Sequence, residues 1–229
     1  MIIQNWLSGF YTGTPELMIR GSATPKMIFG LFVSNLYALN NVINWFSLII
    51  LATTLVSWYL IGILMVRKRS IFIWISFFLI SGTHLFWFIP APTYTAGAVL
   101  LTVSTFTYFV ANLKTNYLTL IVLSFLFTFA YFIRPESFVF ALVCISPIFL
   151  LSIKKLNMKL LFRVITFTLI SIILIFGDFI LEKSYYENNT DWAQYEDFEN
   201  SRYLIQANQP EKDLLDNPKS FGWSMSEAK

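Results

Sequence analysis

Charge, cysteine and histidine are all scarce in this chain. Charged residues make up 13% of the 229 residues, about half of the ~25% that is usual for a soluble domain. Cys144 is the only cysteine, so an intrachain disulfide and a cysteine zinc site are both excluded, and we expect it to pack inside a helical segment. The sequence also contains no Walker loop, dinucleotide-binding glycine pattern or nucleophile elbow, which excludes the common soluble enzyme classes.

Long apolar segments take the place of charge. Hydrophobic residues account for 56% of the chain and the mean hydropathy is +0.63, more than a soluble domain of this length can bury. Six stretches are long enough to cross the roughly 30 Å hydrocarbon layer as helices. They are residues 44–66, 71–89, 93–113, 117–133, 137–153 and 160–181. The predicted fold class is therefore all-α, a polytopic membrane protein with about six transmembrane helices.

The basic residues between these stretches fall on alternate gaps. One set of gaps, together with the start of the sixth stretch, carries Arg67, Lys68, Arg69, Lys114, Lys154, Lys155, Lys159 and Arg163. The opposite gaps contribute only Arg134. Because cytoplasmic loops of membrane proteins are enriched in Lys and Arg, the sequence predicts a plasma (inner) membrane protein with both terminal segments on the outer, periplasmic side.

The two outer segments differ in character from the six-helix domain at 44–181. Residues 1–43 are expected to form an interfacial loop followed by a short helix at Met27–Asn40 that is too short to span. No signal peptide is recognisable before Lys26, so we expect the chain to be a fragment or a late-called start of a longer protein.

Residues 182–229 carry ten acidic side chains against five basic ones, which argues against nucleic-acid binding. We expect this tail to form short amphipathic helices on the outer face. Its apolar stripe consists of Trp192, Tyr195, Phe198 and Ile205. The tail is therefore a candidate surface for docking a protein partner.

The turn between the fourth and fifth stretches is the strongest candidate for a site. Pro135 suits the first position of a helix, and Glu136 is favourable near the positive end of that helix. Arg134 is unusual because it lies on the side that otherwise avoids positive charge. Its guanidinium could clamp a lipid-linked phosphate through paired donors, or it could form an intramolecular pair or anchor to headgroups.

Two further polar residues lie within the predicted spans. His84, the only histidine, follows Gly82, which would let another helix approach. A polar residue at that depth is either functional or a helix-packing hydrogen bond. Asp178 lies about one turn from the outer end of the sixth span. It could act as a general base or hold a divalent ion, or be a solvated carboxylate at the helix end. A divalent cation is the one cofactor that the sequence suggests, and its identity is left open.

This layout resembles the GT-C-type membrane glycosyltransferases and related bacterial multi-pass families. The resemblance rests on the turn Arg134 to Ser137, and on a tail in which Phe198, Asn200 and Arg202 precede Phe221, Gly222, Trp223 and Ser224. It implies sugar transfer from a polyprenyl-phosphate donor at the outer membrane face, with Arg134 near the phosphate. The family carries an acidic residue in its first outer loop. Residues 1–15 contain no acid, so Glu16 or Asp178 would have to serve.

Two other classes of function fit the same layout. A transporter or lipid-flipping protein would require paired polar residues or broken helices near the membrane midplane. A non-catalytic membrane subunit would use its acidic tail to dock a partner. The sequence offers only His84 for the first of these.

Overall fold

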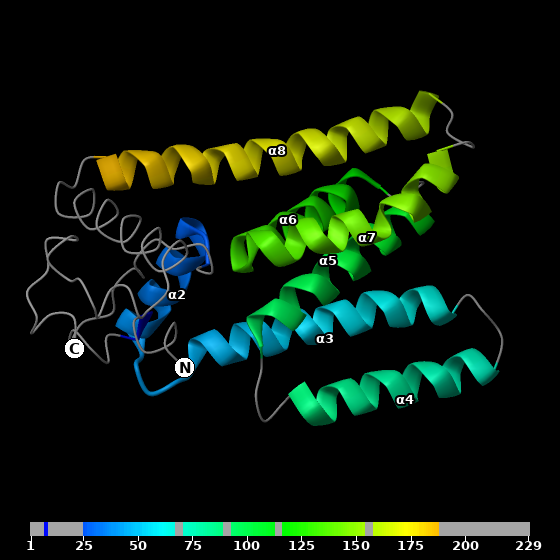
Figure 1. Cartoon of the computed structure of the whole chain (residues 1–229), viewed down its shortest axis with the longest axis horizontal. Coiled ribbons are helices and arrows are strands. Elements are labelled where there is room, and N and C mark those ends of the chain that lie inside the picture. The colour runs from blue at the N-terminus through cyan, green and yellow to red at the C-terminus, as the bar shows by residue number, and fades with distance from the viewer. Residues whose placement is uncertain are drawn as a thin grey trace, which may run out of the picture. The chain divides into compact units, whose positions relative to one another are not determined.

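The computed structural model describes residues 7–8, 25–66, 71–88, 93–112, 116–153 and 158–187. All the regular elements in these ranges are α-helices, so the all-α prediction is confirmed there (Figure 1). The helices are α2 (Met27–Leu39), α3 (Trp45–Val66), α4 (Ile71–Phe88), α5 (Tyr94–Ala111), α6 (Tyr117–Ile133), α7 (Pro135–Ile153) and α8 (Met158–Glu187). The chain divides into two compact units, Met1–Ile180 and Leu181–Lys229, and the helical core belongs to the first.

Each predicted span corresponds to one helix, and the short helix expected at Met27–Asn40 is α2. The bounds agree with the prediction to within two residues, except that α8 extends to Glu187 and not to residue 181. Within the described residues, three helical segments are long and apolar enough to cross a membrane, namely Trp45–Val66, Tyr94–Ala111 and Leu161–Tyr185. The apolar parts of α2, α4, α6 and α7 are shorter.

Helix α5 lies at the centre of the helical core. It packs against α3, α6 and α7, while α4 contacts α3 and the short α2 contacts α3 and α6 (Figure 1). Aromatic stacking brings α8 onto this arrangement, because the ring of Phe167 lies 4.2 Å from that of Phe109 in α5 and 5.1 Å from that of Phe127 in α6. These rings form the centre of one apolar cluster, and a second cluster forms around Phe29 of α2.

The packed faces of α3, α5 and α6 carry small hydroxyl side chains. The buried ones are Thr53, Thr54, Ser57, Thr102, Ser104, Thr105, Ser124 and Thr128. Each donates a hydrogen bond to a carbonyl three or four residues earlier in its own helix. Their donors are therefore satisfied without a partner on a neighbouring helix, and their small size lets the helices approach closely.

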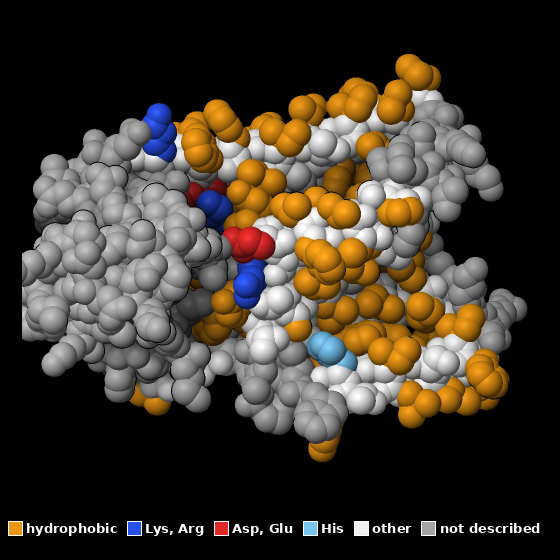
Figure 2. Space-filling model, in the orientation of Figure 1, with side chains coloured by type: hydrophobic (Ala, Val, Ile, Leu, Met, Phe, Trp, Pro, Cys, Tyr) orange, Lys and Arg blue, Asp and Glu red, His pale blue; other side chains and the backbone are white. Residues whose placement is uncertain are grey.

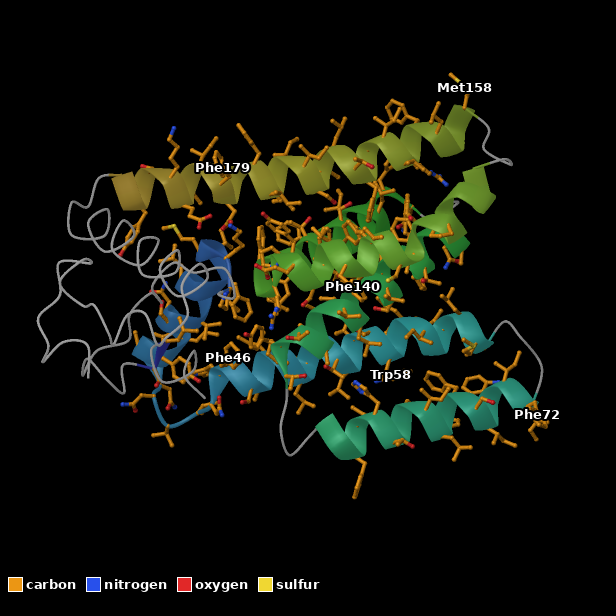
Figure 3. All side chains as sticks on the ribbon, viewed as in Figure 1. Phe46, Trp58, Phe72, Phe140, Met158 and Phe179 are labelled. Carbon is orange, nitrogen blue, oxygen red and sulfur yellow. The ribbon has the colours of Figure 1, made fainter. Side chains whose placement is uncertain are left out.

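The outward faces carry the large apolar side chains. Figure 2 shows hydrophobic side chains along the exposed sides of the helices. Phe72, Phe140 and Phe179 are more than half exposed (Figure 3). A soluble protein buries such residues, so the helices present to their surroundings the surface that a hydrocarbon solvent favours.

Gly97 marks the closest approach of α5 to α3. A Cβ atom at this position would lie 3.2 Å from Ile50 Cγ2 and 3.5 Å from Thr53 Oγ1. The expectation that Gly82 admits a neighbouring helix was wrong, because a Cβ atom there would meet nothing within 4 Å. Hydropathy could not distinguish the two glycines, since only the packing of α3 on α5 decides which one is crowded.

Helix α7 tolerates Pro147 in its interior because a side chain replaces the missing backbone donor. Proline has no N–H to donate to the carbonyl four residues earlier. That carbonyl, of Val143, accepts a hydrogen bond of 2.8 Å from the Ser146 hydroxyl instead. Cys144 is exposed on this helix, so the expectation that it packs was wrong. The buried face of α7 is formed by Phe138, Ala141 and Ile145, and Cys144 lies beside that face.

The connection from α2 to α3 is closed by Tyr37. Its hydroxyl donates to Asn44 Oδ1 at 3.1 Å and accepts from the N–H of Phe46 at 3.2 Å. Burial raises the pKa of Tyr37, while the hydrogen bond from Phe46 acts in the opposite direction. The phenol therefore stays protonated at neutral pH and keeps donating to Asn44, which fixes the end of α2 to the start of α3.

We predict that replacing Gly97 with leucine destabilises the helical core, whereas the same change at Gly82 does not. Leucine at 97 must displace Ile50 and Thr53, and overpacking of this kind costs about 1–3 kcal/mol. Thermal unfolding in detergent should give a lower Tm for Gly97→Leu and an unchanged Tm for Gly82→Leu. Equal Tm values for the two variants would contradict close packing at Gly97.

Candidate functional site at the α2 end of the helices

The short helix α2 is tied by its N-terminal backbone to two other helices. The N–H of Lys26 donates to the carbonyl of Phe132 in α6 at 2.8 Å, and the N–H of Ile28 donates to Asp178 Oδ1 in α8 at 2.9 Å. The first N–H groups of a helix lack partners within the helix itself. Here α6 and α8 supply acceptors, so α2 is held where the two helices meet it.

Aromatic packing secures α2 on a third side. The ring of Phe29 lies 6.1 Å from that of Phe46 at the start of α3 and 5.7 Å from that of Phe129 in α6. Phe46 in turn meets the ring of Tyr94, the first residue of α5, at 6.2 Å. The start of α3, the start of α5 and the end of α6 are thereby brought to the same place.

Asp178 is buried at this junction, with 1% of its surface exposed. The interpretation of Asp178 as a solvated carboxylate at a helix end was therefore wrong. Its side chain lies at the N-terminus of α2, where the positive end of the helix dipole favours a carboxylate. Sequence reasoning missed this role because the hydrogen-bond partner, Ile28, is 150 residues away in the chain.

Arg134 is the single residue between α6 and α7. Its N–H donates to the carbonyl of Ala130 at 3.2 Å, and its own carbonyl accepts from the N–H of Phe138 at 3.1 Å. Its backbone is extended, with φ −160° and ψ 101°, as is favoured for a residue that precedes proline. Both neighbouring helices therefore fix the position from which the Arg134 side chain projects.

The guanidinium of Arg134 contacts the first turn of α5 and of α7. Its Nη1 donates to Thr95 Oγ1, its Cζ lies 4.9 Å from the centre of the Tyr94 ring, and its Nε lies 3.8 Å from Glu136 Oε2. Within the described residues, Nε is buried and makes no hydrogen bond. The Arg134 side chain as a whole is 25% exposed. The intramolecular pair expected with Arg134 is thus present, and the phosphate role stays a prediction.

An arginine held in this way suits the binding of an anion. An arginine side chain has five N–H donors in a planar, positively charged fork. The Tyr94 ring and the Thr95 hydroxyl orient that plane without neutralising it, because neither carries a negative charge. Tyr94 and Thr95 could not be recognised from the sequence, because only their position at the start of a predicted span set them apart.

His84 belongs to a different contact. Trp58 Nε1 in α3 donates to His84 Nδ1 at 3.3 Å, and the two rings lie 5.6 Å apart (Figure 3 labels Trp58). Of the two alternatives for His84, the structure shows a hydrogen bond between two helices, and a functional role stays a prediction. The candidate polar residues therefore separate into three groups: Arg134 with Glu136, His84 in the α3–α4 contact, and Asp178 at the start of α2.

Other predicted site features lie outside the described residues. They are Glu16, the apolar stripe from Trp192 to Ile205, and the Phe221 to Ser224 motif. Within the described residues, no group of three or more His, Cys, Asp or Glu side chains could hold a metal ion.

Comparisons of the chain with protein-family models, with curated proteins and with solved structures gave no match. The function proposed for the site therefore depends on its geometry and on the sequence pattern.

We predict that Asp178→Ala loosens α2 and that Asp178→Asn does so much less. Alanine leaves the N–H of Ile28 without its acceptor at a cost of about 1–3 kcal/mol, whereas the asparagine side chain retains an oxygen. Hydrogen–deuterium exchange at residues 27–39 should be faster in Asp178→Ala. Identical exchange in both variants and the unmodified chain would show that Asp178 does not hold α2.

Proposed function

We propose that this chain is a six-span membrane protein of the GT-C type that binds a polyprenyl-phosphate-linked sugar at the outer face of the plasma membrane. The observation that carries the proposal is the arrangement around Arg134. A permanently charged, partly exposed guanidinium is held over Tyr94 and bonded to Thr95, and Thr95 is its one hydrogen-bond acceptor among the described residues.

The distribution of side chains supports placement of all six helices in a bilayer. The large apolar residues point outward, and the buried hydroxyls are bonded within their own helices. In a bilayer, polar groups have to form their hydrogen bonds within the protein, whereas apolar side chains can face the lipid without a cost in free energy. Helices α4, α6 and α7 are short, which a chain can accommodate by standing upright or by thinning the bilayer locally.

The position of Arg134 supports the outer face. The gaps rich in Lys and Arg belong to the opposite ends of the helices, and the positive-inside rule assigns those ends to the cytoplasm. At the outer interface a guanidinium can reach a lipid phosphate while the helices below it contact the hydrocarbon chain. An anion bound there gains from partial desolvation, which strengthens charge-assisted hydrogen bonds.

Sugar transfer further requires a carboxylate beside the acceptor hydroxyl and positive charge on the departing phosphate. We assign the second role to Arg134. Asp178 is buried beneath α2 and already accepts the N–H of Ile28, so we assign it the positioning of α2. The catalytic carboxylate proposed for this chain is therefore Glu16, in the segment that precedes α2.

The contact between α3 and α4 supports this function over transport. A transporter or lipid-flipping protein needs polar or charged groups paired along a path near the midplane. The Trp58–His84 hydrogen bond joins two aromatic side chains whose rings meet edge-on. The Trp58 ring also packs against the ring of Phe77, with the two centroids 5.8 Å apart. Such a contact fastens α4 to α3 and provides no charged path.

We predict that Arg134→Ala weakens binding of a polyprenyl-phosphate sugar about tenfold to a hundredfold, since hydrogen bonds to a charged group contribute about 1.5–3 kcal/mol. Arg134→Lys should recover only part of the affinity, because lysine lacks the planar fork. The measurement is the Kd in nanodiscs, by fluorescence with a labelled lipid.

Arg163→Ala is the matched control for this measurement, because it removes the same charge from the opposite end of the helices in α8. It should leave the Kd close to that of the unmodified chain. Unchanged affinity in both Arg134 variants would remove the phosphate role of Arg134.

Orientation is tested by cysteine labelling in a Cys144→Ala background. We predict that a membrane-impermeant maleimide added to intact cells labels Ser220→Cys and not Ser70→Cys, because residue 70 follows the basic cluster at 67–69. Permeabilised cells should give labelling of both. Labelling of Ser70→Cys in intact cells would reverse the orientation and move Arg134 to the cytoplasmic face.

A further inference from the structure

The contact between Arg134 and Glu136 is a weak one. Glu136 Oε2 lies 3.8 Å from Arg134 Nε, beyond the roughly 2.7–3.2 Å of a hydrogen bond. Nε itself makes no hydrogen bond within the described residues. The Glu136 side chain is 53% exposed. The carboxylate thus lies close enough to balance the charge of the guanidinium without being fastened to it.

Glu136 lies where it can obstruct the approach of a phosphate to the Arg134 guanidinium. Nε is buried and Nη1 already donates to Thr95 Oγ1, so an anion has to approach the part of the guanidinium that is exposed. The Glu136 carboxylate lies beside this guanidinium, 3.8 Å from Nε, and is itself half exposed. A phosphate that binds the guanidinium must therefore displace the carboxylate or accept the repulsion of a like charge.

The Glu136 carboxylate can move away from Arg134 and still be stabilised by its position in the first turn of α7. It lies in the first turn of α7, where the positive end of the helix dipole favours a carboxylate even when it points into solvent. The Arg134 side chain, by contrast, is held by Thr95 and Tyr94 from α5. When an anion arrives, Glu136 is the partner that moves.

We propose that Glu136 is an internal counter-ion that competes with the lipid phosphate for Arg134 and sets the charge selectivity of the site. This inference rests on the proposed phosphate role of Arg134. A phosphodiester-linked sugar carries one negative charge, whereas the phosphomonoester left after transfer carries about 1.5 to 2 at neutral pH. Repulsion by Glu136 therefore acts more strongly on the product than on the donor, and the returning carboxylate promotes product release.

The test compares the unmodified chain with Glu136→Gln in nanodiscs. The probes are a short-chain polyprenyl phosphate and the corresponding polyprenyl-phosphate sugar. Removing one like charge a few ångströms from the phosphate should tighten binding of the monoester about threefold to tenfold, and that of the phosphodiester by less. Glu136→Asp, which keeps the charge, should remain closer to the unmodified chain.

The matched control places Glu136→Gln in an Arg134→Gln background. If Glu136 competes for the guanidinium, its removal gives a smaller gain in affinity once the guanidinium is absent, because only the direct repulsion between the carboxylate and the phosphate is then removed. The counter-ion role would be overturned if Glu136→Gln bound the monoester no more tightly than the unmodified chain. The phosphate site would stand in that case if binding still depended on Arg134. Equal binding by the unmodified chain and Arg134→Gln would overturn both. A Tm for each variant separates these outcomes from loss of folding.

Discussion

The need of buried hydroxyl and backbone groups for a hydrogen-bond partner within the chain governs how these helices pack. The hydroxyls between α3, α5 and α6 bond to carbonyls of their own helices, and the carbonyl left without a partner by Pro147 accepts from Ser146. Because these needs are met locally, the facing surfaces can be small and close, as at Gly97. The large apolar side chains are then left for the outside, where a bilayer is the solvent that suits them.

The same requirement explains the position of α2. A helix of 13 residues cannot cross a bilayer, and its first N–H groups have no partners within it. The carbonyl of Phe132 and the carboxylate of Asp178 provide acceptors. Phe132 lies at the end of α6, two residues before Arg134, so the short helix α2 is fixed beside the turn that carries Arg134. A buried acid that resembles a catalytic group is thereby explained by the needs of the backbone.

Local pattern predicted the helices well and the contacts between them poorly. Apolar length and turn residues located the six long helices and α2, because these signals act within about twenty residues of each other. Gly82 and Gly97 look alike in sequence, and only the approach of α3 to α5 separates them. Asp178 was misjudged for the same reason, since its partner is distant in the chain. The pairing of Arg134 with Glu136 lay within one turn and could be anticipated.

Rigidity distinguishes Arg134 from an arginine that projects from a long surface loop. Most arginines at a membrane surface lose considerable side-chain entropy on binding an anion. Arg134 has no loop around it: α6 ends at Ile133, α7 begins at Pro135, and the backbone of Arg134 is bonded to both helices. Its guanidinium is already oriented by Tyr94 and Thr95. The ordering cost has therefore been met in the folding of the chain, which leaves more of the interaction energy for the phosphate that we propose Arg134 binds.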